Sequence, residues 1–322
     1  MKPKNCLIFG ASGLVGRNLI RKLTSNNFKV TAVTRNLHQK GYLLKTQGNP
    51  GYVDIVEINI FDESKIRNLV SSADICINLI GILYQKGKLN TFENIHEKIP
   101  KLLSELCEKN NVKQFIHLSA LGIEEAKDSL YAKSKLNGEI EVKRNYKNAT
   151  ILRPSVIYSV DDNFTNNFMQ LLSLLPIFPL YHKGATLFRP IHVSDLTEII
   201  YKVILNNIRS EIIECIGQEE MSLKNIIQKL SKLIEKERTL ISIPLPLAKL
   251  SAYFFEFFPK PLLTNDQLRL LKYHNLPSGK YKTNFDLNFL SKSNFEEEVK
   301  KYCYTWKEEG QFSQSKYKID NF

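Results

Sequence analysis

A glycine-rich stretch near the start of the chain decides the fold, and it reads Gly10-Ala-Ser-Gly13-Leu-Val-Gly16. It follows an apolar, strand-like run at residues 6–9 and opens a segment of helical period at residues 14–25. Gly10 allows a tight turn, Gly13 lets a phosphate approach the backbone, and Gly16 permits close packing of the helix on the strand. Because the N-terminus of a helix attracts anions, the stretch predicts a strand–turn–helix cradle for a pyrophosphate. The expected contacts are Gly10, Ser12, Gly13, Leu14, Val15 and Gly16.

The first 150 residues alternate short apolar segments with segments of helical period. The expected strands are residues 6–9, 30–34, 55–58, 75–79, 114–118 and 149–152. The expected helices between them are residues 14–25, 63–70, 92–110 and 131–146. Alternating strands and helices indicate crossover connections in a parallel sheet, and strands that are apolar throughout indicate burial on both faces. The sequence therefore predicts an α/β fold, a Rossmann-type doubly wound parallel sheet.

After Pro154 the regular alternation stops. Helices are expected at residues 164–175, 194–206 and 222–234, the last with Ser222 as its N-cap. We expect a nucleotide-binding domain over residues 1–205, with elements of a second lobe inserted after about residue 155. Residues 206–322 are expected to form a smaller, mostly helical C-terminal lobe that serves as a docking region.

The composition is that of a folded, basic protein. The chain has 322 residues, of which 43% are hydrophobic and 24% charged, and a formal net charge of +12. The positive excess is spread along the chain without a block of Lys and Arg. It therefore predicts anionic partners, such as phosphates or an acidic membrane surface, and does not indicate nucleic acid.

The cysteines and the apolar segments indicate where in the cell the protein is expected. Five cysteines lie far apart with no CxxC pair, which argues against a disulfide framework and a zinc site, so no metal is expected. The N-terminal apolar run is too short for a signal peptide, and no apolar run approaches the roughly 20 residues of a membrane span. These features predict a cytoplasmic protein, either soluble or peripheral on a membrane.

The residues at the end of the second expected strand bear on the choice of nucleotide. Thr34-Arg35 stands where sites that prefer NAD place an acidic residue for the ribose 2′-hydroxyl. Arg35 is positioned instead for a 2′-phosphate, with Arg17 as a second positive charge, so the sequence favours NADP(H) over NAD(H). The alternative is an Arg35 that is simply solvated.

A second set of polar residues follows the fifth expected strand. Ser119 ends that strand, and Tyr131 and Lys135 lie four residues apart on one face of the next helix. An ammonium beside a phenol lowers the pKa of the phenol because it favours the phenolate. Such a tyrosine transfers the proton that accompanies hydride transfer, while a serine hydroxyl holds the substrate oxygen. The three residues therefore predict a catalytic-type set.

Together these motifs resemble the short-chain dehydrogenase/reductase superfamily, in the extended or atypical branch that includes the NAD-dependent epimerases and dehydratases. The resemblance runs from residue 5 to about residue 205 and includes Phe188-Arg-Pro-Ile-His-Val-Ser-Asp195. It implies that residues after the third strand flank the adenine and that a glycine after the fourth lies at the ribose. It also implies that the segment after the sixth strand lies at the nicotinamide. The nucleotide contacts so implied are Asn59, Ile60, Gly81, Tyr131, Lys135, Pro154 and Ile157.

A nearly full-length resemblance is to the NAD(P)H-binding accessory subunits of respiratory complex I, the NADH:ubiquinone oxidoreductase. It rests on Asn78-Leu-Ile-Gly-Ile-Leu83, His117-Leu-Ser-Ala-Leu-Gly122 and Lys260-Pro-Leu-Leu-Thr-Asn-Asp-Gln-Leu-Arg-Leu-Leu271. The resemblance implies a nucleotide bound for structure or assembly with little or no turnover. It also implies subunits of a membrane quinone reductase as partners, and a peripheral place on the inner face of an energy-transducing membrane.

Two positions depart from the superfamily pattern. His96 stands where many of its enzymes keep an Asn that serves a proton relay, and Ser159 stands where a glycine is common. The first departure argues against efficient redox turnover. Two alternatives stay open: an active NADPH-dependent reductase or epimerase with Tyr131 as acid/base, and a nucleotide redox sensor of the NmrA-like type.

An aromatic segment of the C-terminal lobe has two interpretations. Residues 253–258 contain one tyrosine and four phenylalanines, and Lys249 and Lys260 flank them. Large apolar residues are usually buried, which favours a core helix of the lobe. If the cluster is instead exposed, it indicates a surface that docks on a membrane interface or on a hydrophobic partner.

Overall fold

The computed structural model describes residues 3–257, 261, 263–308 and 310. The chain divides into two compact units: residues 1–155, 193–216 and 277–291 form the first, and residues 156–192, 217–276 and 292–322 form the second. Residues 277–291, which the sequence assigns to the lobe, thus belong to the first unit. Compactness does not establish independent folding, so the domain limits of 1–205 and 206–322 stay a prediction.

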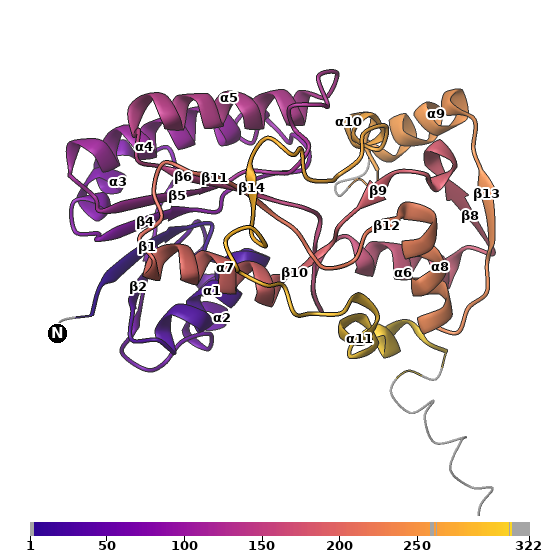
Figure 1. The fold of residues 1–322 in the computed structure, drawn as a ribbon, viewed down its shortest axis with the longest axis horizontal. Coiled ribbons are helices and arrows are strands. Elements are labelled where there is room, and N and C mark those ends of the chain that lie inside the picture. Colours follow the sequence, from indigo (N-terminus) through magenta and orange to yellow (C-terminus); the bar gives the residue numbers. More distant parts are fainter. Residues whose placement is uncertain (1–2, 258–260, 262, 309, 311–322) are drawn as a thin grey trace, which may run out of the picture. The chain divides into compact units, whose positions relative to one another are not determined.

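An eight-stranded sheet forms the centre of the first unit (Figure 1). Its strand order is β14-β11-β6-β5-β4-β1-β2-β3, and all neighbouring strands are parallel. The strands are β1 (Asn5–Phe9), β2 (Lys29–Thr34), β3 (Val53–Glu57), β4 (Ile75–Asn78), β5 (Gln114–Leu118), β6 (Thr150–Pro154), β11 (Ile212–Cys215) and β14 (Lys282–Thr283). This architecture confirms the predicted Rossmann-type fold.

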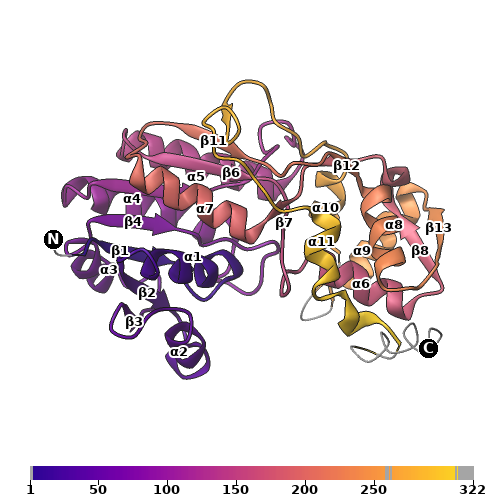
Figure 2. The same ribbon diagram turned by 60° about the horizontal axis from the view of Figure 1, so that its bottom comes forward.

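Helices cover both faces of this sheet (Figures 1 and 2). One face carries α3 (Glu63–Val70), α4 (Ile99–Lys109) and α5 (Leu130–Asn145), and α1 (Leu14–Thr24) and α7 (Val193–Leu205) pack side by side on the other. A further helix, α2 (Leu37–Lys45), connects β2 to β3. The helix expected at residues 92–110 begins as a π-helix, η1 (Glu93–Lys98), and continues as α4. A π-turn inside a helix often marks a functional site.

The strands are buried because their side chains are apolar on both faces. Every residue of β4 and β5 is buried, as expected for parallel strands covered by helices on both sides. Leu7 and Phe9 of β1 pack with Phe115 of β5 and with Leu103 of α4 in one apolar cluster. All five cysteines are buried, and their thiols form no disulfide.

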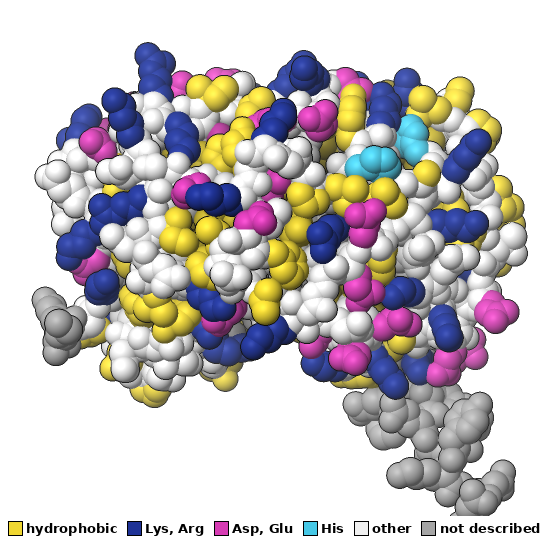
Figure 3. Space-filling model, in the orientation of Figure 1, with side chains coloured by type: hydrophobic (Ala, Val, Ile, Leu, Met, Phe, Trp, Pro, Cys, Tyr) yellow, Lys and Arg dark blue, Asp and Glu magenta, His cyan; other side chains and the backbone are white. Residues whose placement is uncertain are grey.

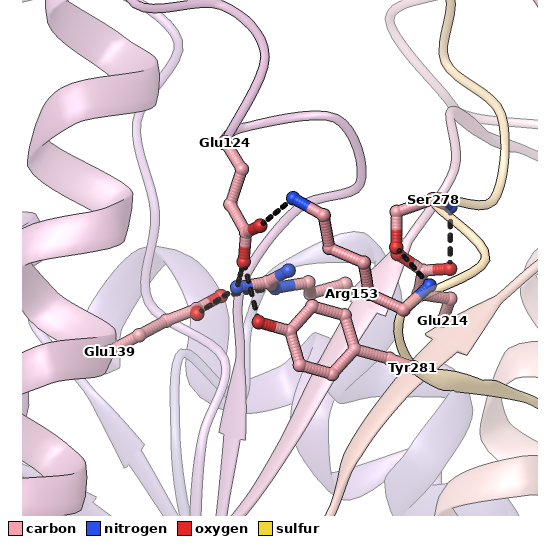
Figure 4. Close-up of polar contacts among 7 residues, drawn as sticks. Glu124, Glu139, Arg153, Glu214, Ser278 and Tyr281 are labelled. Carbon is pink, nitrogen blue, oxygen red and sulfur yellow. Dashed lines mark hydrogen bonds and ion pairs between the residues drawn. The ribbon is translucent and has the colours of Figure 1, made fainter.

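An ion-pair network centred on the buried Arg153 joins four segments of the first unit (Figure 4). Arg153 of β6 donates two hydrogen bonds to the carboxylate of Glu139 on α5, at 2.9 and 2.6 Å. Its guanidinium also lies 2.8 Å from Glu124 and 4.6 Å from the centre of the Tyr281 ring. The Tyr281 hydroxyl and the Lys280 ammonium donate to Glu124 at 2.7 and 3.2 Å. Burial alone would raise the pKa of Glu124, but these donors outweigh it and lower that pKa.

The network and a strand pairing tie residues 277–291 to the sheet. β14 pairs with β11 in parallel, and the backbone N–H of Ser278 donates to Glu214 of β11 at 2.9 Å (Figure 4). Asn284 accepts from the backbone of Ile216 at 2.8 Å and donates to Ser291 at 3.2 Å. A segment from near the end of the chain therefore completes the edge of the nucleotide-binding unit.

The second unit is built from short elements around its own apolar core. Its helices are α6 (Thr165–Leu174), η2 (Tyr181–Gly184), α8 (Leu223–Leu233), α9 (Leu245–Phe255), α10 (Asn265–Leu270), α11 (Phe295–Lys300) and η3 (Cys303–Trp306). Its strands are β7 (Ile157–Tyr158), β8 (Ile177–Leu180), β9 (Leu187–Phe188), β10 (Ile191–His192), β12 (Met221–Ser222) and β13 (Thr239–Ser242). Ser222 caps α8 as predicted, since its hydroxyl accepts from the backbone of Asn225 at 3.1 Å. Among the described residues, no helix is both long enough and apolar enough to span a membrane.

Candidate functional site: the nucleotide cradle

The glycine-rich turn between β1 and α1 has the geometry of a phosphate cradle. Gly10 has a left-handed φ of 80°, and a Cβ atom there would lie 2.9 Å from the backbone of Leu79. A Cβ atom on Gly16 would lie 2.5 Å from the carbonyl oxygens of Gly10 and Ala11. Any side chain at either position would therefore push the turn apart. The turn is closed by a 3.0 Å hydrogen bond from the Gly13 N–H to the Gly10 carbonyl.

The first turn of α1 is arranged to receive an anion. Gly13 is the N-cap residue, and among the described residues the cap makes no side-chain hydrogen bond to the N–H groups of that turn. These groups and the helix dipole favour a phosphate at this place. The Arg17 side chain donates to the Gly13 carbonyl at 3.3 Å, which holds the guanidinium beside the cradle. A dinucleotide pyrophosphate therefore fits the turn, because small residues, free donors and positive charge coincide there.

Arg35 is held on one side of the cradle by an unexpected partner. Its guanidinium donates to the side-chain oxygen of Asn90 at 3.0 Å. Arg35 follows β2, and Asn90 lies in the connection after β4, whereas the cradle follows β1 between these two strands. The bond therefore joins the connections that follow the two neighbours of β1 in the sheet. Asn90 was not recognisable from the sequence because no local pattern pairs it with Arg35.

The residues expected at the adenine and the ribose lie at the carboxyl ends of β3 and β4. Asn59 follows β3, and its side-chain oxygen accepts from the Phe61 backbone at 3.1 Å, while Ile60 is 4% exposed. Gly81 follows β4, and a Cβ atom there would lie 3.3 Å from the Lys135 ammonium. Gly81 and Lys135 are thus neighbours, as the resemblance requires of two groups at one ribose.

Ser119 and Lys135 converge at the end of β5. The Lys135 ammonium is 4% exposed and donates to the carbonyl of Leu118, the residue before Ser119, at 3.1 Å. Burial lowers the pKa of Lys135 to about 8, although the Glu139 carboxylate acts in the opposite direction. The Ser119 hydroxyl is also buried, and it has no hydrogen-bond partner within the described part of the chain.

Tyr131 stands in the first turn of α5 beside two aromatic rings of the π-helix region. Its ring makes edge contacts with Phe92 and His96, at centroid distances of 5.9 and 5.3 Å. Phe92 and His96 stack on each other at 5.4 Å. Tyr131 and Lys135 are one helical turn apart on α5, as the sequence predicts. The catalytic roles of Ser119, Tyr131 and Lys135 remain a prediction.

His96 has no free ring nitrogen. Its Nε2 accepts from the Ile82 backbone at 3.1 Å, so the ring proton is on Nδ1, which lies 2.9 Å from the Ser134 hydroxyl. Ser134 in turn donates to the Tyr131 carbonyl at 2.8 Å. Burial and the nearby Lys135 charge lower the pKa of His96 to about 2. The ring is therefore neutral, and both of its nitrogens are engaged by described residues.

A second buried histidine was missed by the sequence analysis as a site residue. The side-chain oxygen of Asn78 accepts a hydrogen bond from the Ile80 backbone N–H at 3.1 Å. The side-chain nitrogen of Asn78 lies 3.1 Å from His117 Nδ1. His117 Nδ1 is therefore the acceptor and Nε2 carries the proton, but Nε2 has no partner among the described residues. Burial, with Lys135 adding to it, lowers the pKa of His117 to about 3. Polar residues in strands that are otherwise apolar were the available signal.

The residues expected at the nicotinamide fall in both units. Pro154 ends β6, and its carbonyl accepts from the backbone of Leu121 at 2.9 Å. Ile157 belongs to the second unit, where it pairs with Ile191 in the parallel strands β7 and β10. Ser159 follows β7, and its backbone N–H donates to Asp162 at 2.8 Å. Their contacts with a nucleotide remain a prediction.

Comparison with known proteins supports a nicotinamide-nucleotide-binding domain. A family model described as NAD(P)H-binding matches residues 10–170, half of the chain. Subunit 9 of the NADH dehydrogenase (ubiquinone) 1 alpha subcomplex, mitochondrial, from Arabidopsis thaliana is 25% identical, over 84% of this chain and 70% of its own length. The subunit of the same name from Mus musculus is 30% identical, over 59% of this chain and 50% of its own length. The 40 kDa subunit of NADH-ubiquinone oxidoreductase from Neurospora crassa is 25% identical, over 75% of this chain and 63% of its own length. The chain thus spans half to about two thirds of these relatives.

Solved structures with a similar fold include nucleotide-sugar enzymes. UDP-glucuronic acid 4-epimerase from Bacillus cereus has a TM-score of 0.69 and 18% identity, covering 93% of this chain and 98% of its own. The dTDP-glucose 4,6-dehydratase from Bacillus anthracis has a TM-score of 0.69 and 14% identity, covering 96% and 97%. At such identities the likeness shows the extended epimerase/dehydratase fold alone. The matched family model supports a nicotinamide nucleotide as the cofactor. By its sequence and its cradle, the chain belongs to the NAD(P)H-binding family.

Proposed function

We propose that this protein is an NADP(H)-binding accessory or assembly subunit of a respiratory NADH:quinone oxidoreductase. The relatives from plant, mouse and fungus, all named as subunits of that enzyme, support the assignment. The observation that carries the low turnover is the engaged ring of His96, which offers no route for a proton beside Tyr131 and Lys135. The nucleotide is then a structural ligand.

The proposed nucleotide site uses residues at the carboxyl ends of β1, β3, β4 and β6, two residues of α5 and the first residue of β7. The cradle holds the pyrophosphate, Asn59 and Ile60 flank the adenine, and Gly81 with Lys135 and Tyr131 meets the nicotinamide ribose. Pro154 and Ile157 border the nicotinamide. When bound in its reduced form, the nucleotide would supply a hydride to a substrate held at Ser119. A ligand bound at 100 to 1,000 times its Kd stabilises the fold by about 3–4 kcal/mol, which is a sufficient role for a structural nucleotide.

We expect Arg35 to determine the preference for NADPH. In the Arg35→Ala variant the Kd for NADPH should rise roughly 10- to 100-fold, the value of a hydrogen bond to a charged group, while the Kd for NADH changes less than about twofold. Titration calorimetry with both nucleotides measures this. Arg67→Ala, which removes an exposed arginine on α3, is the matched control. Tighter binding of NADH than NADPH by the wild-type protein would overturn the NADP assignment.

An active reductase or epimerase is the second candidate, and the convergence of Ser119 and Lys135 near Tyr131 favours it. The two candidates differ in turnover. The accessory role predicts that the protein purifies with NADPH that exchanges slowly and is not oxidised by carbonyl or nucleotide-sugar substrates. A steady NADPH-consuming activity that is lost in Tyr131→Phe would establish the enzyme instead.

The proposed location is the inner, cytoplasmic face of an energy-transducing membrane, with quinone-reductase subunits as protein partners. The net charge of +12 supports a further contact with an anionic membrane surface. Affinity capture of the full chain from gently solubilised membranes tests the role. Recovery of quinone-reductase subunits is the expected result, and recovery of the chain without any of them would contradict the proposal.

A further inference from the structure

An ordinary surface helix buries its large apolar residues, whereas helix α9 of the second unit exposes them. Its buried residues are the small Ala248 and Ala252, which pack with Leu268 of α10. Its large apolar residues lie on the opposite side, because at 100° per residue they fall roughly 140–260° from Ala248. This outward face, together with the turn after the helix, consists of Leu247, Leu250, Tyr253, Phe254 and Phe257, which are 57–73% exposed.

The exposed face settles the two interpretations of the aromatic segment for the residues described. Phe254 and Phe257 are exposed and Phe255 is half-buried, whereas Phe258 and Lys260 lie outside the described residues. Strand β13 adds Ile241 and its partner β8 adds Ile177, both exposed, while Phe178 on the alternate side of β8 is buried. Figure 3 shows hydrophobic side chains gathered over α9 and β13, with Lys or Arg side chains among them.

A cavity of about 320 Å³ lies where α9 begins. Its lining combines polar groups of η2 and β13 with apolar groups of the first turn of α9. The residues are Tyr181, His182, Lys183, Ser242, Ile243, Pro244, Leu245 and Ala248. Lys183 is exposed, and no carboxylate belongs to the lining. The cavity therefore has a cationic rim and an apolar wall that continues into the outward face of α9.

The rim of the cavity is held in an unfavourable backbone conformation. His182 and Lys183 have left-handed φ values of 47° and 58°, which residues other than glycine rarely adopt, and Gly184 follows with 67°. Strained conformations of this kind persist at functional sites more often than elsewhere. The Nε2 atom of His182 is buried and has no partner among the described residues. An imidazole nitrogen and a lysine cation thus lie together at one end of an apolar surface.

We propose that this cavity binds the phosphate of an anionic phospholipid while the outward face of α9 lies in the acyl region of the same membrane surface. Only an amphiphile satisfies the cationic rim and the apolar face together. Leucine and aromatic residues on one side, with Lys249 on the flank, are the composition of a helix that lies in a membrane interface. The inference rests on the proposed function, which says which membrane the protein meets. Lipid binding is measured on the isolated protein, separately from nucleotide retention, so the two proposals can fail independently.

Co-sedimentation with sucrose-loaded vesicles tests the proposal. The full chain should bind vesicles of 70% phosphatidylcholine and 30% phosphatidylglycerol at least about tenfold more tightly than phosphatidylcholine alone, since each lysine near an anionic surface contributes about fivefold. The double variant Leu250→Asp/Phe254→Asp should lose binding to both. Lys183→Ala should weaken binding to the anionic vesicles about fivefold and leave binding to neutral vesicles unchanged.

The control is Tyr42→Asp, which places the same charge on an exposed apolar residue of α2 in the first unit and should not change vesicle binding. The altered residues are exposed, so each variant should fold normally. Nucleotide retention by each variant checks that it has done so. Equal binding to neutral and anionic vesicles would overturn the phosphate site. The proposal would also be overturned if the wild-type chain bound no vesicles and the Leu250→Asp/Phe254→Asp variant no longer captured quinone-reductase subunits. In that case the outward face of α9 would be a protein interface.

Discussion

Replacing Glu139 with alanine is expected to lower the free energy of unfolding by about 3–5 kcal/mol. Glu139 and Arg153 are each 3% exposed and are joined by two hydrogen bonds. Removing the carboxylate leaves a buried guanidinium whose one remaining anionic partner in the described part of the chain is the half-buried Glu124. A buried charge without its partner costs more than the pair contributes, which accounts for the size of the effect. Urea unfolding at pH 7 measures the change.

Two further variants separate this effect from simple loss of contacts. The double variant Glu139→Leu/Arg153→Met removes both charges and should recover most of the stability, because apolar residues of similar size can replace a buried pair at little cost. Glu63→Ala breaks an exposed pair with Arg67 at 2.9 Å and should cost less than about 0.5 kcal/mol. A loss in Glu139→Ala no larger than that in Glu63→Ala would contradict the prediction.

The same network connects the end of the chain to the candidate site. Glu124 lies in the connection between Ser119 and Tyr131, and it is held by Tyr281 and Lys280 of the segment that adds β14. Glu139 lies one helical turn beyond Lys135 on α5. A segment remote in sequence therefore holds Glu124 directly and contacts Arg153, the partner of Glu139. Loss of Glu139 should consequently loosen nucleotide binding as well as lower stability.

Much of the sheet could be predicted because its signals are local. Each apolar run of the first 150 residues became a strand within two residues of its expected ends, for example 114–118 as β5. The helix at residues 63–70 was also predicted with its observed ends, since Asp62 supplies the N-cap and Ile66 and Val70 supply the buried face. The cradle was predictable for the same reason: a turn between a strand and a helix is specified by residues within ten positions.

The remaining features depend on contacts that are distant in sequence. β14 contains two residues, and only pairing with β11 makes it a strand. The inverted packing of α9 follows from the space left for Ala248 and Ala252 beside α10, which no helical pattern reveals. The hydrogen bond from Arg35 to Asn90 joins two connections 55 residues apart. Periodicity identifies elements, but it does not say which faces or connections meet.

The two buried histidines are expected to make the protein sensitive to mild acid. In the folded state the pKa of His96 is lowered to about 2 and that of His117 to about 3, from an ordinary value of 6.5. Below pH 6.5 the unfolded chain binds protons at these sites and the folded protein does not, so the free energy of unfolding falls as the pH falls. Each histidine contributes a slope of about 1.4 kcal/mol per pH unit. The stabilisation is fully present above about pH 6.5 and is lost progressively below it.

Variants measured between pH 6.5 and 5 isolate this contribution, because the carboxylates with lowered pKa values titrate at lower pH. In His117→Asn and in His96→Asn the slope of unfolding free energy against pH should be smaller than in the wild type by about 1.4 kcal/mol per pH unit. The buried Lys135 adds no slope in this window, since its pKa of about 8 leaves it protonated in both states. The wild-type slope, measured in the same buffers, is the reference for both variants. If His117→Asn and the wild type gave the same slope, His117 would be charged in the folded protein, and its assignment as a neutral donor beside Lys135 would be wrong.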